Sequence, residues 1–125
     1  YLPEWLVSTP LRELNLSNNN LASIPSYVGQ LETLTSLNFS KNRINAIPAE
    51  IYNIVKLQNL ILAHNQMTAL PTGLSKLSNL RTLDLSYNRL SVLPPDADAL
   101  LIQGIIHTYG NRYPLWQEDS DRLLH

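Results

Sequence analysis

The residues best suited to catalysis are Asp84, Ser86 and His107, which together supply the side-chain types of a hydrolytic triad. Asp84 and His107 stand 23 residues apart, so they meet only if the chain repeats with that length. On adjacent strands their Cβ atoms would be about 5 Å apart. No glycine-rich elbow or pair of amides near them suggests an oxyanion hole. We therefore predict that the chain is not an enzyme, and that Asp84 and His107 form an ion pair or part of a binding surface.

The sequence has even fewer residues suited to binding a metal or a cofactor. There is no cysteine, which removes thiolate ligands, cysteine nucleophiles and disulfides together. His64 and His107 fall two strands apart and lack a third ligand at useful spacing. Neither a phosphate-binding glycine loop nor an EF-hand pattern occurs. We expect no metal, no cofactor and no small-molecule substrate.

Charge and hydropathy restrict the choice of partner. Lys plus Arg count 9 against 10 for Asp plus Glu, and the net charge of -1 gives no general attraction to nucleic acid or anionic membranes. No apolar run approaches the roughly 20 residues of a membrane span, and the N-terminus lacks the layout of a signal peptide. With 125 residues, 44% of them hydrophobic, the chain has the size of one folded domain. We expect neither nucleic acid nor a membrane as a partner.

The sequence repeats itself with a period of 23 residues. Two residue types mark that interval four times each: Pro25, Pro48, Pro71 and Pro94, and Asn19, Asn42, Asn65 and Asn88. Residues 11–33, 34–56, 57–79 and 80–102 fit LxxLxLxxNxLxxLPxxLxxLxx, with Ile, Val, Phe or Met allowed for Leu. The LxxLxL half alternates as a short strand with one buried face does, and the LPxxLxxL half has the apolar spacing of a 3₁₀ or helical turn. Proline suits the start of that turn because it has no amide to lose there.

This pattern resembles the leucine-rich repeat, and its LPxxLxxL half resembles the Ras-group type of Scribble-like scaffolds, plant intracellular Ras-group proteins and fungal adenylate cyclases. The resemblance implies an α/β solenoid, an arc with a parallel concave sheet and short 3₁₀ or helical segments on its convex side. The repeated asparagines would then satisfy backbone groups in the loop after each strand. The core would be formed by the apolar positions of each repeat, in the first case Leu14, Leu16, Leu21, Ile24, Val28 and Leu31.

Both ends of the chain depart from the pattern. Residues 1–10 resemble the tail of a preceding repeat, and residues 103–125 resemble a degenerate capping repeat followed by a tail. We expect a fifth strand over 105–109, because Ile-Ile-His-Thr-Tyr is rich in β-forming residues, and the alternative is a helix over 98–109 that stops at Gly110. Residues 1–125 are thus interpreted as a single domain and as a fragment of a longer protein.

Strand residues that do not enter the core must point out of the concave face, because side chains alternate. Ile61 stands in that face among aromatic and charged residues, which is the composition of a protein-binding patch. The alternative is that Ile61 is one of the scattered apolar residues found on any protein surface. The predicted partner-binding residues are Ile61, His64, Arg81, Asp84, Tyr87, Lys41, Asn38 and His107.

The sequence therefore predicts a protein–protein interaction module that binds a partner on its concave face, in intracellular signalling or scaffolding. The resemblance implies a small GTPase or a signalling enzyme as the partner. One alternative is that the repeats serve a catalytic domain outside this fragment, and another is spacing or self-association through an exposed repeat edge. N-glycosylation sequons at Asn15 and Asn38 would place glycans on the concave face of a secreted chain, which favours the cytoplasm, or else the nucleus.

Overall fold

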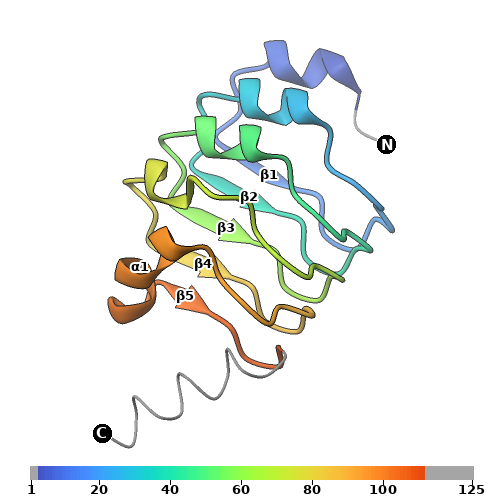
Figure 1. Ribbon diagram of the computed structural model, residues 1–125. Coiled ribbons are helices and arrows are strands. Elements are labelled where there is room, and N and C mark those ends of the chain that lie inside the picture. Colours follow the sequence, from blue (N-terminus) through green and yellow to red (C-terminus); the bar gives the residue numbers. More distant parts are fainter. Residues whose placement is uncertain (1–2, 112–125) are drawn as a thin grey trace, which may run out of the picture.

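The computed structural model describes residues 3–111, which stack into an arc with a parallel sheet on one side and short helical turns on the other (Figure 1). Each strand is followed by an exit loop and then by an outer turn that leads to the next strand. The elements are η1 (Glu4–Ser8), β1 (Glu13–Asn15), η2 (Ser26–Gln30), β2 (Ser36–Asn38), η3 (Ala49–Asn53), β3 (Asn59–Ile61), η4 (Leu74–Lys76), β4 (Thr82–Asp84), η5 (Pro95–Ala97), α1 (Asp98–Ile102) and β5 (Ile106–His107), where η denotes a 3₁₀ helix.

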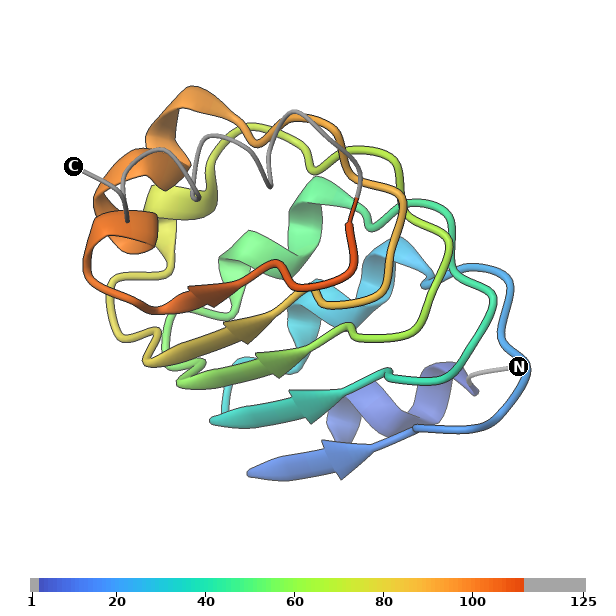
Figure 2. The ribbon, with the colours of Figure 1, turned by 90° about the horizontal axis from the view of Figure 1, so that it is seen from below.

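The sheet has the register that the sequence period requires. Its strands lie in chain order, β1 to β5, and every neighbouring pair is parallel (Figure 2). Leu37 faces Leu60 and Leu60 faces Leu83, so that paired residues differ by 23 positions. A residue type that recurs at that interval therefore forms a column across the sheet.

Prolines begin most of the outer turns. Pro25, Pro48 and Pro94 each stand at the N-cap of a 3₁₀ helix, and the carbonyl of Pro25 accepts a hydrogen bond from the Val28 amide at 3.1 Å. The third repeat differs, because η4 starts after Gly73 rather than at Pro71 and has only three residues. The prediction of a proline-led turn holds for the other repeats described.

The core lies between the sheet and the outer turns. Leu37, Leu60 and Leu83 have no exposed surface, because each lies between two neighbouring strands. Leu14 and Leu16 are only half-buried, so their prediction as core residues is partly wrong. The reason is that Leu14 lies on β1 and Leu16 directly after it, and no described strand covers β1 on its far side.

The segment after the fourth repeat contains both a helix and a strand. α1 ends at Ile102, well before Gly110, and β5 then pairs with β4 through Leu83 and Ile106. The expected strand over 105–109 is thus present in a shorter form, and the alternative helix over 98–109 is wrong beyond its first five residues. The rest of the predicted capping region, 112–125, lies outside the described residues.

Gly29 allows the closest approach between two outer turns, η2 and η3. A Cβ atom at this position would lie 2.3 Å from the backbone oxygen of Glu50. Because this oxygen belongs to the backbone, it cannot move aside as the end of a flexible side chain could. We expect Gly29→Ala to lower the free energy of unfolding by about 1–3 kcal/mol, as overpacking usually does. Urea unfolding followed by circular dichroism measures this. Gly104→Ala is the matched control for added volume, because no atom lies within 4 Å of a Cβ there, and it should show only the cost of its positive φ.

A carboxylate on the convex side links the third and fourth repeats. Oδ2 of Asp96 accepts hydrogen bonds from the amides of Gly73 at 3.1 Å and Ser75 at 3.0 Å. The bond from Ser75, with the bond from Gly73, holds the pKa of Asp96 below its ordinary value of 3.8. Nearby Tyr52 is buried and donates its hydroxyl to the Pro71 carbonyl at 2.8 Å, and burial, with the charge of Asp96, raises the pKa of Tyr52.

Asp96 should make stability depend on acid pH. Because the folded-state pKa is lowered, the ionised carboxylate stabilises the fold above its unfolded pKa, and this contribution disappears as pH falls through the folded value. We expect the difference in unfolding free energy between the wild type and Asp96→Asn to be constant near neutrality and to shrink below about pH 4. Denaturant titrations from pH 3 to 7 measure it. A difference that stays the same across that range would contradict this role.

Candidate protein-binding surface

Buried asparagines fix the exit loop after each strand. Nδ2 of Asn65 donates to the carbonyls of Phe39 at 3.0 Å and Leu62 at 3.1 Å, while its Oδ1 accepts from the Ile44 amide at 3.0 Å. Each such side chain therefore joins its own loop to the loop of the preceding repeat. Asn42, Asn88 and Asn111 form equivalent bonds, and the structural role predicted for this position is confirmed there.

Asn19 is the exception among the four asparagines. It is exposed, and its side-chain amide donates to the Ser17 carbonyl within its own loop at 3.0 Å. The cause is the position of the first repeat at the end of the described stack, where no earlier loop is present to be joined.

The residue directly before each of these asparagines has a left-handed backbone. Lys41, His64 and Tyr87 have φ angles of 57°, 59° and 59°, a region that costs a bulky residue free energy. The same position holds Asn18 in the first repeat and Gly110 in the last, the residue types that tolerate this conformation best. Three consecutive repeats thus keep long or aromatic side chains where Asn or Gly would be more stable.

Those side chains form a fixed aromatic group. The rings of His64 and Tyr87 are stacked, with centroids 4.4 Å apart and an interplanar angle of 12°. Tyr109 meets Tyr87 edge-on at 5.4 Å. On the side of the fifth repeat, a Cβ on Gly110 would lie 2.6 Å from the Tyr87 ring, so the ring occupies the space that this glycine leaves. Tyr87 is therefore held in place while 46% of its surface remains exposed.

The middle column of the sheet consists of Asn15, Asn38, Ile61, Asp84 and His107. Most of these side chains accept a hydrogen bond from the backbone just beyond their own strand. Oδ1 of Asn38 accepts a hydrogen bond from the amide of Ser40, two residues later, at 2.9 Å. Asn15 and Asp84 accept the equivalent bonds from the amides two residues after them, both at 3.0 Å. Ile61 occupies this column between Asn38 and Asp84, and its side chain has no oxygen with which to make the bond. The third repeat thus places a half-buried apolar side chain where its neighbours have a stabilising acceptor.

The structure brings together seven of the eight predicted partner-binding residues. Asn38, Ile61, Asp84 and His107 are register neighbours across β2 to β5. The next column toward the exit loops adds three more, and together these form what we call the concave patch: Asn38, Ile61, Asp84, His107, Lys41, His64 and Tyr87. Arg81 is exposed but precedes β4, at the opposite end of the strand from Tyr87, and so lies apart from the patch.

Sequence reasoning missed Tyr109 and Gly110. Tyr109 was placed at the end of the fifth strand, but the strand stops at His107, and its ring instead packs on Tyr87 with 66% of its surface exposed. Gly110 stands 23 residues after Tyr87, and this spacing was the available signal that one side chain is absent beside that ring.

The triad-like residues lie on the two last strands of the sheet and the loop between β4 and η5. Asp84 and His107 are neighbours in register, and Oδ1 of Asp84 accepts a hydrogen bond from the Ser86 amide. Within residues 3–111, no group of three or more His, Asp or Glu side chains is placed to hold a metal ion. None of the helices described in this range has the length and hydrophobicity of a membrane span.

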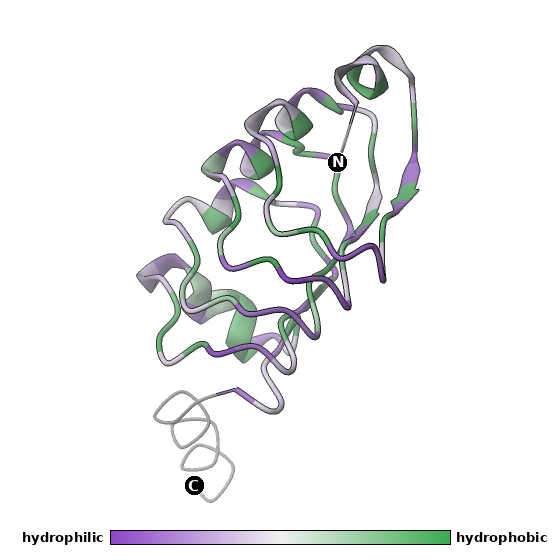
Figure 3. Cartoon of the chain, turned by 90° about the vertical axis from the view of Figure 1, so that its right-hand side faces the viewer, coloured by the Kyte–Doolittle hydropathy of each residue, from purple (hydrophilic) through white to green (hydrophobic). Residues whose placement is uncertain are grey.

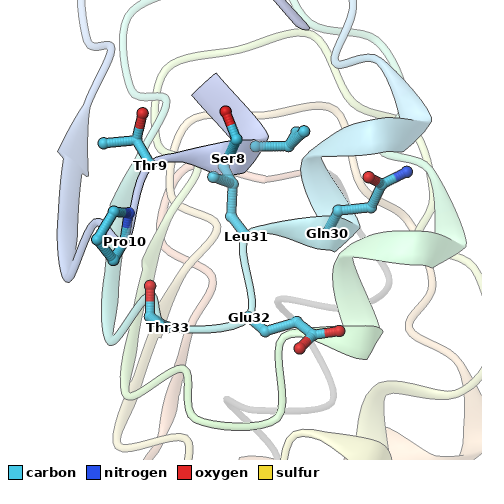
Figure 4. A pocket seen from close by; sticks show the side chains of 8 residues that line it. Ser8, Thr9, Pro10, Gln30, Leu31, Glu32 and Thr33 are labelled. Atoms are coloured by element: carbon cyan, nitrogen blue, oxygen red, sulfur yellow. The ribbon is translucent and has the colours of Figure 1, made fainter. Parts of the chain in front are cut away.

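Two hollows on the described part of the surface lie away from the concave patch. One groove of about 240 Å³ opens between the loop after η1 and the loop after η2 (Figure 4). Its lining includes Leu31, Glu32 and Thr33, and Thr33 donates its hydroxyl to the Leu11 carbonyl at 2.6 Å. Another hollow lies over η2 and η3, lined by Tyr27, Gly29 and Glu50 among others.

A 23-residue period, a parallel sheet with asparagine-linked exit loops and short outer turns define a leucine-rich-repeat solenoid. A family model described as a leucine-rich repeat region matches residues 7–91, and the chain belongs to this family. The comparison with curated proteins found no match to the chain. Proteins built from these repeats in general mediate protein–protein interactions and are not themselves catalytic.

Several solved structures resemble the chain over most of its length. A leucine-rich-repeat protein of Leptospira interrogans is 32% identical with a TM-score of 0.80, covering 90% of this chain and 29% of its own. The ectodomain of the receptor kinase SOBIR1 from Arabidopsis thaliana is 28% identical (TM-score 0.72; 90% of this chain, 63% of its own). A PEPR1–AtPEP1 structure is 35% identical (TM-score 0.73; 89% and 16%). The chain thus spans less than two thirds of each of these proteins.

Proposed function

We propose that this chain is a non-enzymatic interaction module that binds a partner protein on the concave patch. The observation that carries the proposal is Ile61, a half-buried apolar residue on a polar sheet column, where Asn or Asp would add a hydrogen bond. An apolar centre with aromatic and charged neighbours is the usual composition of a binding hot spot. The stacked rings of His64 and Tyr87 are already ordered, so they lose little entropy when a partner binds.

The left-handed backbone at the ends of the strands supports the same proposal. Lys41, His64 and Tyr87 retain a costly backbone conformation, and such residues cluster at functional sites. Their side chains are exposed beside Ile61, where a partner would contact them.

We further propose that the repeats are of the Ras-group type and act inside the cell, in the cytoplasm or the nucleus. The LPxxLxxL segments support the type, and a small GTPase or a signalling enzyme is then the expected partner. The absence of cysteine supports a reducing compartment. Asn15 and Asn38 also use their side chains to close strand ends on the concave face, where a glycan would obstruct binding.

A second candidate function is that the repeats serve an enzyme encoded on the same longer chain. Two observations favour it. This chain spans only part of the similar proteins, and one of those proteins is the ectodomain of a receptor kinase. The concave patch would then bind a substrate or regulator of that enzyme.

Affinity capture from cell lysate tests the main proposal. The baits are the wild type, the double variant Ile61→Asn with Tyr87→Ala, and a control carrying Val55→Asn and Ile102→Asn, two exposed apolar residues outside the patch and the exit loops. All three must first show equal unfolding free energies. A protein captured by the wild type and the control but not by the double variant supports the proposal. The same proteins on all three baits would contradict it.

A further inference from the structure

The loops that leave the strands form one edge of the arc, and this edge has a single sign of charge. We define the exit edge as residues 17–25, 40–48, 63–71 and 86–94, which follow β1 to β4. Not one of these residues is Asp or Glu, whereas Lys41, Arg43 and Arg89 are all present and exposed, with His64 among them. Figure 3 faces this side of the molecule and shows a hydrophilic stretch in successive loops.

The remaining charges show how uneven this distribution is. Among residues 3–111, the carboxylates whose side chains are described lie in the strands or on the convex side: Glu13, Glu32, Glu50, Asp84, Asp96 and Asp98. The chain carries a net charge of only -1, so the positive field of the exit edge is a local property. A field of one sign along an edge attracts and orients a partner of the opposite sign.

The cations stand in register with the aromatic group. Backbone bonds join the exit loops of adjacent repeats: the Lys41 amide donates to the carbonyl of Ala63, directly before His64, at 2.9 Å, and the Tyr87 amide donates to the carbonyl of Tyr109, directly before Gly110, at 2.7 Å. Lys41, His64 and Tyr87 therefore form one row, with about 4.8 Å between successive repeats. Arg43 and Arg89 belong to a second row two residues further along each loop.

We propose that the exit edge binds an extended acidic segment of the partner protein, which crosses the repeats with its carboxylates on Lys41, Arg43 and Arg89 and an apolar or aromatic residue against Tyr87 and Tyr109. Arginine suits this role because its planar guanidinium binds a carboxylate with two parallel hydrogen bonds. This inference rests on the proposed function and names the chemistry of the partner.

The same observations favour a peptide over a uniformly anionic surface. Only three permanent cations lie on the exit edge, too few for the phosphate contacts on which nucleic-acid binding depends. Asp84 in the adjoining column would repel a continuous array of phosphates. An acidic segment can place its carboxylates between these charges.

A labelled peptide of ten glutamates around a central tyrosine is the probe, and its glutamine counterpart is the control. Fluorescence anisotropy compares the wild type with Arg43→Glu/Arg89→Glu and with Lys56→Glu/Lys76→Glu, a pair of convex cations that changes the net charge equally. We expect the wild type to bind the glutamate peptide at low salt and not the glutamine peptide. The edge pair should weaken binding about tenfold, and the convex pair less than twofold. Rising salt should weaken it too.

Several outcomes would overturn the inference: no binding of the glutamate peptide at low salt, equal binding of the glutamine peptide, or equal losses in both charge-reversed pairs. Edge-dependent binding to phosphatidylserine vesicles without peptide binding would also overturn it, in favour of a membrane surface. If the edge pair still captures the partner that the Ile61→Asn/Tyr87→Ala bait loses, the proposed function stands and the acidic-segment inference fails. If that bait loses nothing, the proposed function itself fails.

Discussion

Replacing Asn65 with alanine should lower the free energy of unfolding by about 3–5 kcal/mol, because several buried backbone groups lose their partner at once. Asn65 is 7% exposed and bonds to the Phe39, Leu62 and Ala63 carbonyls and to the Ile44 amide. Each buried group that is left unsatisfied costs roughly 1–3 kcal/mol. The exit loops of two repeats should therefore loosen together.

Urea unfolding followed by circular dichroism measures this loss, with the midpoint and slope fitted separately. Asn19→Ala is the matched control, since Asn19 occupies the same repeat position but is exposed and bonds only within its own loop. It should cost less than about 1 kcal/mol. Equal losses in the two variants would show that the asparagines do not join the repeats in the way described.

The single substitution Ile61→Asn should weaken binding of the captured partner at least tenfold, about 1.4 kcal/mol, while leaving stability within about 1 kcal/mol of the wild type. The new amide can accept from the Ala63 amide, as Asn38 does from Ser40, and this compensates for the apolar contact that is lost. The substitution should therefore lower the affinity for the partner and leave the stability of the fold almost unchanged. Calorimetric titration with the purified partner measures the affinity.

Val55→Asn is the control for that experiment. Val55 is 50% exposed on the turn between η3 and β3, outside the concave face, so removing its apolar side chain should leave the affinity unchanged. If Ile61→Asn binds as tightly as this control, Ile61 is an ordinary exposed apolar residue and not a binding anchor.

Most of the fold could be predicted from the sequence because the 23-residue period is the register of the sheet. Pairs such as Leu60 and Leu83 followed directly from it. The burial of Leu14 did not, since its neighbours depend on what stacks beside β1 and not on the repeat itself. In the fifth repeat the pattern weakens, so the sequence was compatible with either a strand or a helix there. The structure contains both, α1 followed by β5.

The candidate surface was only partly predictable. Alternation along the strands placed Ile61, Asp84 and Tyr87 on one face, but spacing alone could not distinguish a residue that closes its strand from one that is free to bind. The bond that the Ser86 amide donates to Asp84, and the lack of such a bond to the Ile61 side chain, depend on side-chain chemistry and geometry. The stacking of Tyr87 on His64 and over Gly110 depends on a left-handed backbone that no repeat consensus specifies.

The most direct test of the central claim is amide NMR of the isotopically labelled chain with and without its captured partner. Binding on the concave patch predicts shifted or broadened signals over β2 to β5 and the loops that contain Lys41, His64 and Tyr87. Signals from the outer turns η2, η3 and η4 should stay in place. Changes confined to those outer turns, with β3 and β4 unaffected, would contradict a concave binding surface.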